Sequence, residues 1–378
     1  MNVVVVGGGI FGATAALELC VRGDAVTLVD PGPLPHPLAE STDLSKVVRI
    51  DYGADVEYTE LGERSLDGWR RWNRDWPVAR FHETGVAFLA RTPLAPGGFE
   101  YDSFELLTRR GHRLERLDAA AIARRFPAYR PGALVDGYTH AEGGWAESGA
   151  VVADLLAIAR ARGVVVRECG VERIVEDGVL LGDREHLRAD HIVACAGAWT
   201  TALLPELADV LHSVGQPVFH LAPPDPSLFE AARFPVFGAD IARTGYYGFP
   251  LAAGVVKIAN HGTGIAMRPD EPRAVTDAQT AALRAMLADT FPALADAPIV
   301  ASRLCVYGDS IDGHFWIARH PERANLTIAC GGSGHAFKFA PLLGAMIADA
   351  MLGEPVSSRF RWRPELARAA RGDAARSS

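Results

Sequence analysis

The sequence lacks an excess of positive charge, a long apolar run and a recognisable cysteine pattern. Its 38 basic and 46 acidic residues give a net charge of −8, which argues against nucleic acid or an anionic membrane as the main partner. No apolar run reaches the ~18 residues of a membrane span. The cysteines are odd in number, scattered and never spaced C-x-x-C, so neither a disulfide framework nor a metal site is predicted. They are Cys20, Cys169, Cys195, Cys305 and Cys330.

The amino terminus also lacks the features of a secretory signal. Met1 leads directly into an apolar run, without a basic region or a cleavage site, and we therefore expect a cytoplasmic protein. The chain is 49% hydrophobic and 22% charged, as is typical of soluble globular proteins. Its 378 residues exceed one ordinary core, so two domains are expected.

The first thirty residues carry the strongest local pattern. Residues 3–6 are four valines, the glycines follow as Gly7-x-Gly9-x-x-Gly12, and a second apolar run ends at Asp30. In such a strand–turn–helix–strand unit the glycines allow a tight turn, a close approach of pyrophosphate and close helix packing, while the acid accepts hydrogen bonds from ribose. The phosphates lie at the positive end of the helix. The pattern predicts a dinucleotide site at this end of the chain.

Two further segments have the same character. An apolar run at 192–195 is followed by the small residues 196–198 and Trp199, and the strand-like NLTIAC leads into GGSGHAFKFAP and a helix at 342–351, with Lys338 at its mouth. Helices are also expected at 58–76, 104–112, 118–126, 150–162 and 275–290, and strands at 81–90, 164–168, 171–175, 255–258 and 298–308. The proline-rich segment 31–58 is expected to be irregular. The basic, Ala/Ser-rich tail after Pro355 is expected to fray.

Several polar residues allow two interpretations. Ser45, Lys46 and Arg49 serve a bound anion or are solvated surface groups. Lys257, between two apolar residues on a strand, either extends to an edge or is buried for a function. The tryptophans of 58–76 are interpreted as core.

The spacing of these units predicts a discontinuous nucleotide-binding domain of the doubly wound α/β type. It comprises residues 1–80, 141–213 and 308–378, and residues 81–140 and 214–307 form a second, substrate domain. Ligands of such sheets bind at the carboxyl ends of the strands.

Taken together, six motifs resemble one family, the FAD-dependent amine oxidases of the D-amino-acid-oxidase superfamily, in its monomeric sarcosine oxidase and N-methyltryptophan oxidase branch. The motifs are GGGIFG at 7–12, SKVVRIDYG at 45–53, CAGAW at 195–199, YGFP with K-x-x-x-H at 247–261, RLCVY at 303–307 and GGSGHAFKFAP at 331–341. The resemblance implies a glutathione-reductase-type FAD domain joined to a substrate domain with a large antiparallel sheet capped by helices.

The resemblance also implies the residues that hold FAD. Cys305 would carry the flavin through a thioether to its 8α-methyl group; without the neighbouring motif it would be an ordinary buried strand cysteine. The remaining cofactor contacts would be Gly7, Gly9, Ile10, Phe11, Gly12, Asp30, Ser45, Lys46, Ala196, Gly197, Trp199, Gly332, Gly334, His335 and Lys338.

The same resemblance assigns the chemistry. Arg49 and Lys338 match a carboxylate-binding pair, and Lys257 matches a lysine that assists oxygen reduction through its charge. Tyr247, His261 and Tyr307 match polar residues that line the substrate pocket.

The chain also departs from the family pattern. Lys46 stands where sarcosine oxidase has arginine, and Trp316 would add bulk on the flavin side of its strand. Tyr246, Tyr247 and the loop 216–245 would shape the pocket for a substrate other than sarcosine.

The expected function is an FAD-dependent oxidase of a secondary or cyclic amino acid or related amine, which forms an imine and hydrogen peroxide. We expect a monomer whose partners are the small-molecule substrate and O₂. The alternative is an FAD-dependent dehydrogenase, or a 2-hydroxy-acid or primary amino-acid oxidoreductase, of the same superfamily. A non-catalytic flavin-binding protein is disfavoured because Arg49, Lys257 and Lys338 would be three unpaired cations facing one cavity. A nicotinamide enzyme is disfavoured by Cys305 and the second glycine motif.

Overall fold

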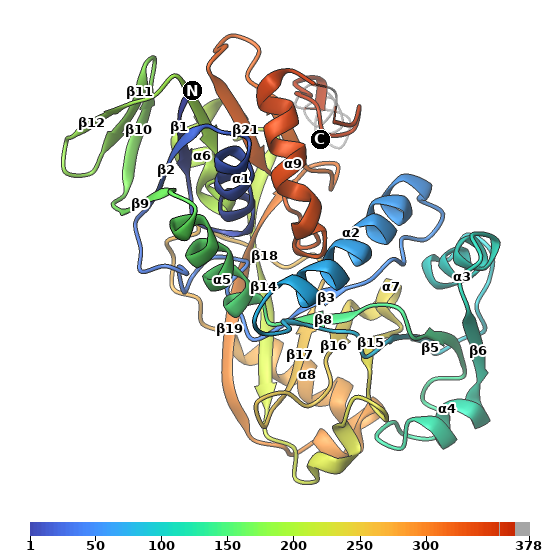
Figure 1. Ribbon diagram of the computed structural model, residues 1–378. Coiled ribbons are helices and arrows are strands. Elements are labelled where there is room, and N and C mark those ends of the chain that lie inside the picture. The colour runs from blue at the N-terminus through green and yellow to red at the C-terminus, as the bar shows by residue number, and fades with distance from the viewer. Residues whose placement is uncertain (355, 367–378) are drawn as a thin grey trace, which may run out of the picture.

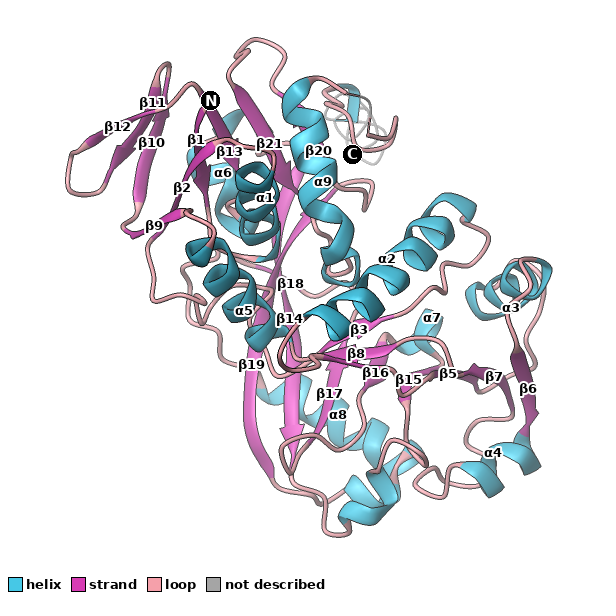
Figure 2. Cartoon of the chain, in the orientation of Figure 1, coloured by secondary structure: helices cyan, strands magenta, loops and turns pink. Residues whose placement is uncertain are grey.

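Two large β-sheets form the frame of the computed structural model, which describes residues 1–354 and 356–366. A mainly parallel sheet lies in the upper part of the view and a mainly antiparallel sheet in the lower part (Figure 1). Helices pack against both, which confirms the predicted α/β class (Figure 2).

The parallel sheet has the strand order β20-β21-β13-β1-β2-β9, and only β20 runs antiparallel to its neighbour. The valines of β1 alternate between two layers because successive side chains of a strand point to opposite faces. Val3 and Val5 pack with the helices α1 (Ile10–Val21), α5 (Ser148–Ala161) and α9 (Ala340–Leu352). Val4 and Val6 pack on the other face. The strands are β1 (Asn2–Val6), β2 (Ala25–Asp30), β9 (Val165–Glu168), β13 (His191–Ala194), β20 (Trp316–Arg319) and β21 (Leu326–Cys330).

That other face is covered by a small three-stranded sheet and by short helices. Val179 and Leu181 of the small sheet join the same apolar cluster as Val4 and Val6. With both faces covered, the central strands β1, β13 and β21 are mostly apolar. The covering elements are β10 (Val171–Val175), β11 (Gly178–Leu181), β12 (His186–Arg188), η1 (Gly197–Trp199), α6 (Thr200–Leu203) and η2 (Pro205–Leu207).

The second large sheet has the order β18-β14-β17-β16-β15-β5-β7-β6, with β19 paired to β14. Its two long strands pair from Leu211 opposite Ser310 to Leu221 opposite Ile299 and run from the parallel sheet to the far end of the molecule (Figure 1). Its strands are β5 (Val86–Ala90), β6 (Leu114–Asp118), β7 (Asp136–His140), β14 (Leu211–Leu221), β15 (Val236–Ala239), β16 (Tyr246–Gly248), β17 (Val256–Asn260), β18 (Ile265–Ala266) and β19 (Ile299–Ser310). Its helices are α3 (Phe99–Arg109), α4 (Ala119–Arg125), η3 (Pro226–Phe229), α7 (Ile241–Thr244), α8 (Asp277–Thr290) and η4 (Pro292–Leu294).

A junction of short strands and one long helix lies between the two sheets. The strands β3 (Lys46–Val48), β8 (Gly144–Ala146) and β4 (Phe81–His82) form a small sheet, and α2 (Val56–Asp75) crosses beside it (Figure 1). The tryptophans of α2 face the core, as predicted: Trp69 is buried and donates to the Lys338 carbonyl of η5 (Phe337–Phe339) at 2.7 Å.

Some local predictions were wrong. The segment 31–58 is not wholly irregular, since it contains β3. The strand expected at 81–90 is broken into β4 and β5 by a turn in which Gly85 has φ +76°, and α3 begins at Phe99 rather than at 104.

The tail after Pro355 is packed in its first part, contrary to the prediction of fraying. Phe360 is buried and its carbonyl accepts from Ile317 N, and Arg363 pairs with Asp312 at 2.9 Å. Residues 355 and 367–378 lie outside the described part. Among the residues that the structure describes, no helix combines the length and apolarity needed to span a bilayer.

Candidate functional site

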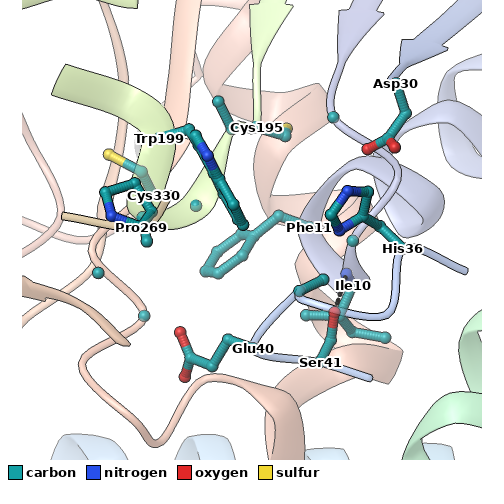
Figure 3. Close-up of a pocket in the computed structure, with 18 of the residues that line it drawn as sticks. Ile10, Phe11, Asp30, His36, Glu40, Ser41, Cys195, Trp199, Pro269 and Cys330 are labelled. Carbon is teal, nitrogen blue, oxygen red and sulfur yellow. Dashed lines mark hydrogen bonds between the residues drawn. The ribbon is translucent and has the colours of Figure 1, made fainter. Parts of the chain in front are cut away.

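A cavity of about 480 Å³ opens at the carboxyl ends of β1, β2 and β13. We call it the large cavity. Figure 3 shows Phe11, Asp30, His36, Glu40 and Trp199 arranged around it. Its wall includes the predicted cofactor contacts Gly7, Gly9, Ile10, Phe11, Asp30, Lys46, Ala196, Gly197, Trp199, Gly332 and Gly334.

The glycine turn after β1 folds this way because larger residues do not fit. A Cβ on Gly7, whose φ is +103°, would lie 2.4 Å from the Cys195 carbonyl oxygen. A Cβ on Gly12 would lie 1.8 Å from the Gly7 carbonyl oxygen, so α1 approaches the strand only without a side chain at this position. Gly9, the N-cap, has no side chain to cap the helix. Ser41 Oγ accepts from Ile10 N at 3.2 Å, and the following N–H groups of the first turn are left for an anion.

Asp30 is held rigidly at the tip of β2. Its Oδ2 accepts from Gly8 N at 2.7 Å and its Oδ1 from Gly32 N at 2.9 Å. Each carboxylate oxygen retains a lone pair for a ribose hydroxyl. Gly197 lies on the wall of the same cavity with φ +54°. Apart from its chain neighbours, no described residue has an atom within 4 Å of the position that the Gly197 Cβ would take, so the absence of a side chain keeps this space open for a ligand. The turns without side chains, the unbonded N–H groups in the first turn of α1 and the Asp30 carboxylate together fit FAD.

A second cavity, of about 80 Å³, adjoins the first. We call it the small cavity. Lys46 lies on the walls of both cavities. The Lys46 Nζ is 3.6 Å from Cys305 Sγ and 5.9 Å from the centroid of the Tyr307 ring. Nearby negative groups raise the pKa of Lys46 despite its burial, so a cation marks the point where the cavities meet.

Cys305 is almost completely buried on β19 and packs with Val218, Ala259 and Tyr307. It is a free thiol. Glu40, which the sequence analysis missed, lies on the wall of the large cavity (Figure 3), and burial raises the pKa of its carboxyl to about 7. Its neighbours are distant in sequence, so no local pattern signalled it.

Arg49 and Lys338 meet at the small cavity. The Arg49 guanidinium lies over the rings of Tyr52 (4.7 Å), Phe99 (5.5 Å) and Phe88 (5.7 Å), and its buried Nη1 has no hydrogen-bond partner among the described residues. Lys338 is 5% exposed and donates to the His335 carbonyl at 2.8 Å. Burial and Arg49 lower its pKa well below the ordinary value. The two cations make an electropositive site that suits an anion.

The remaining wall of the small cavity combines polar and apolar groups. Burial and the charges of Lys338 and Arg49 lower the pKa of His261 to about 4, so its imidazole is neutral. Burial raises the pKa of the Tyr247 hydroxyl. Tyr307, which the resemblance also assigned to the pocket wall, does not line the cavity: it is buried in the core cluster that contains Cys305, with Tyr247 packed against it, and burial raises its pKa. The apolar lining is provided by Val47, Val86, Phe88, Val236, Phe237, Ile241 and Phe337.

Lys257 is buried, but it lines neither cavity. Its Nζ donates to Asp43 Oδ2 at 2.6 Å and to the Ser45 carbonyl at 2.5 Å. The expectation of three unpaired cations in one cavity was therefore wrong: Lys257 has a carboxylate partner. The Ser45 side chain is buried too, and its hydroxyl has no partner among the described residues.

Two pocket assignments were also wrong. Trp316 lines neither cavity and packs against Trp362 and Arg363 instead. Tyr246 packs on the core of the antiparallel sheet, so only Tyr247 of this pair reaches the small cavity.

Comparisons with known proteins agree with this geometry. A family model described as DAO, FAD dependent oxidoreductase, matches residues 2–350. Monomeric sarcosine oxidase of Bacillus sp. (strain B-0618) is 28% identical over 364 residues, which cover 93% of this chain and 92% of that protein. N-methyl-L-tryptophan oxidase of Salmonella arizonae is 30% identical over 358 residues, with 92% and 94% covered.

Solved structures give the same fold. The deglycating fructosamine oxidase Amadoriase II of Aspergillus fumigatus superposes with a TM-score of 0.80 at 25% identity, covering 97% of this chain and 90% of that one. Glycine oxidase of Geobacillus kaustophilus, at 19% identity, has a TM-score of 0.78 with 94% and 95% covered. These likenesses confirm the predicted arrangement of an FAD-binding sheet and a substrate sheet.

Proposed function

Because the chain belongs to the DAO family of FAD-dependent oxidoreductases, we propose that it oxidises an N-methyl or cyclic amino acid, or a closely related amine, to an imine. Bound FAD supplies the acceptor for a hydride from the carbon next to nitrogen, and O₂ takes up the electrons to give hydrogen peroxide. The observation that carries the proposal is the pair of buried cations, Arg49 and Lys338, at a cavity that adjoins the large one.

The two cations bind and orient the substrate carboxylate. The planar fork of Arg49 makes two parallel hydrogen bonds to a carboxylate, and Lys338 adds a point charge. The same positive charges disfavour protonation of the nearby substrate amine, and a neutral His261 adds no further repulsion. The substrate is thus held with its amine in the reactive neutral form.

The apolar wall determines what else fits. Val86, Val236 and Ile241 face the small cavity beside Phe88, and none of them can hydrogen-bond a polar group. A charged substrate side chain would lose its hydration there without compensation. We therefore favour substrates with apolar side chains or aliphatic rings.

Two finer assignments are part of the proposal. Cys305 would hold the flavin through a thioether to its 8α-methyl group; replacement of the S–H bond and one methyl C–H bond by the C–S bond would release two electrons and two protons, which bound FAD would accept and pass to O₂. Lys257 would assist oxygen reduction through its charge. Denaturation in acid tests the first: yellow colour that remains with the precipitated protein supports the link, and free flavin in the supernatant refutes it.

A peroxide-coupled screen of N-methyl and cyclic amino acids tests the activity. Each acid is paired with the matching amine that lacks the carboxylate. We expect the acids to be the better substrates. Amines that outperform their acids would overturn the roles of Arg49 and Lys338.

One observation favours a second candidate, a dehydrogenase that uses another electron acceptor. Asp43 compensates the charge of Lys257 at 2.6 Å, which weakens its attraction for developing negative charge on oxygen. Reoxidation of the substrate-reduced enzyme by O₂, followed at the flavin absorbance, separates the two. A rate that stays far below that with an artificial acceptor identifies a dehydrogenase.

A further inference from the structure

We propose that Asp43 is a positioning residue that holds the Lys257 ammonium in its place and in its charged form at the junction of the two sheets. The inference deepens the proposed oxidase function and rests on it for the role of Lys257. It concerns a contact between a loop and a strand that lie 214 positions apart.

The ion pair is built for one geometry. A lysine has three donor hydrogens, and two of those on Lys257 are taken by Asp43 and the Ser45 carbonyl. The Nζ also lies 4.7 Å from the centroid of the Phe249 ring. With less than 4% of either side chain exposed, the ammonium has one remaining donor and no alternative solvent partner.

Asp43 is itself fixed by neighbouring elements. Its Oδ1 accepts from Leu44 N at 2.7 Å, and its carbonyl accepts from Ser148 Oγ and Gly149 N at the start of α5, at 2.8 and 3.0 Å. His220 Nε2 on β14 lies 3.5 Å from its Oδ1. The carboxylate therefore has little freedom to leave Lys257.

The groups around the pair act on Lys257 in opposite directions, and Asp43 is the largest of those that favour its ionised form. Lys257 faces Asp43, Lys46 on β3 and Cys305 on β19. Burial lowers the pKa of Lys257 to about 8, and Lys46 lowers it too, whereas Asp43 and Cys305 act in the opposite direction.

Asp43 faces Lys257, His220, Lys46 and Arg303. These partners outweigh burial and hold the pKa of Asp43 well below its usual range. If Asp43 were removed, burial and the charge of Lys46 would still lower the pKa of Lys257, and the largest interaction that raises it would be lost.

The amino-acid composition argues that Lys257 has a role other than stabilising the fold. A buried ion pair is often no more stable than well-packed apolar residues of similar volume. Only three of the 38 basic residues are lysines, and they are Lys46, Lys257 and Lys338; the other 35 are arginines. All three lie at the two cavities or behind them. Arginine stays charged in proteins, whereas the pKa of a lysine shifts with its surroundings. A lysine at this site therefore has a proton affinity that its neighbours can adjust.

The small number of lysines makes the test direct. In holoenzyme labelled with [¹³Cε]lysine, three NMR signals are expected, and Lys257→Met identifies one of them by its loss. Removal of an opposite charge at this distance lowers a lysine pKa by about 1–3 units. We expect Asp43→Asn to shift the Lys257 titration down by that amount and Asp43→Glu to restore it in part.

Two controls separate positioning from general damage. Glu40→Gln neutralises another buried carboxyl that does not bond to Lys257, and it is expected to leave the Lys257 titration within about 0.3 units. In the oxidase assay, Asp43→Asn should move the pH profile of flavin reoxidation to lower pH together with the NMR pKa. In the Lys257→Met background, Asp43→Asn should have no such effect.

The outcomes are decisive in both directions. A Lys257 pKa that is unchanged or raised in Asp43→Asn overturns the proposal, and so does a reoxidation profile that shifts equally without Lys257. The NMR titration needs no turnover, so failure to find an amine substrate would refute the proposed function and leave this inference standing.

Discussion

Replacement of Arg49 by methionine is the sharpest test of the carboxylate site, because it has opposite expected effects on activity and stability. Methionine keeps much of the side-chain volume and removes the charge. The Arg49 guanidinium is held among three aromatic rings, and its Nη1 has no partner in the described part of the chain. Under the proposed function, the substrate carboxylate would supply the hydrogen-bond partner that Arg49 lacks.

The magnitude follows from that missing partner. Truncation of one side of a buried, hydrogen-bonded charge pair costs about 2–5 kcal/mol. We expect kcat/KM for a carboxylated substrate to fall roughly 10²–10³-fold, since ~1.4 kcal/mol corresponds to a factor of ten. For the matching amine without a carboxylate, we expect a change of less than about threefold.

Without substrate, the same substitution should raise the thermal stability. The aromatic rings return only ~0.5–2 kcal/mol to a buried cation, less than its desolvation costs. Steady-state peroxide assays with both substrates and a thermal melt of the substrate-free holoenzyme measure the two effects. Equal losses with the acid and the amine would show that Arg49 does not bind the carboxylate. A lower melting temperature would show that its charge is already compensated.

Three further predictions concern the cofactor site. Cys305→Ser should bind FAD that is released by acid, as judged by the flavin in the supernatant, whereas the unmodified protein retains it; equal release from both would contradict the covalent link. Gly12→Ala should lose most of its flavin and more than ~2 kcal/mol of stability, because the added Cβ would lie 1.8 Å from the Gly7 carbonyl oxygen. Gly182→Ala is the matched control, since its added Cβ would lie 3.6 Å from the nearest atom. Normal flavin content in Gly12→Ala would contradict the tight packing of α1 on the strand. The pKa of Glu40 in the flavin-free fold is raised to about 7 from 4.5, so its contribution to stability is fully present below pH 4.5 and is lost as the pH rises through 7. We expect the free energy of unfolding of the flavin-free Cys305→Ser protein, minus that of the same protein with Glu40→Gln, to decline across this interval. A difference that does not change with pH would refute the raised pKa.

The elements that sequence patterns predicted well are those defined by local physics. The unit from Val3 to Asp30 follows from strand alternation, from glycine spacing and from one helix, all within thirty residues. The burial of Lys257 was one of two interpretations that its apolar neighbours allowed. The family motifs then assigned roles to residues such as Arg49 and Lys338, which the structure brings together at one cavity.

The sequence could not show contacts that depend on distant chain crossings. Asp43 and Lys257 are 214 positions apart, and a carboxylate in a proline-rich loop has no pattern that distinguishes a buried partner from a solvated group. Glu40 was missed for the same reason. Trp316 was expected near the flavin, but it packs against Trp362 of the C-terminal segment, a contact that no local pattern indicates.

The location of the three lysines determines which amines the product of the proposed reaction could modify. Imines of N-methyl amino acids hydrolyse to aldehydes, and aldehydes condense with unprotonated primary amines. Outside the two cavities and the Asp43 pair, the described structure offers such a reagent only the α-amino group of Met1, which is paired with Asp24 at 2.9 Å. Apart from Met1, the arginine-rich exterior of the described structure therefore offers no amine for Schiff-base formation, and an amine-directed label will modify Met1 or one of the three lysines.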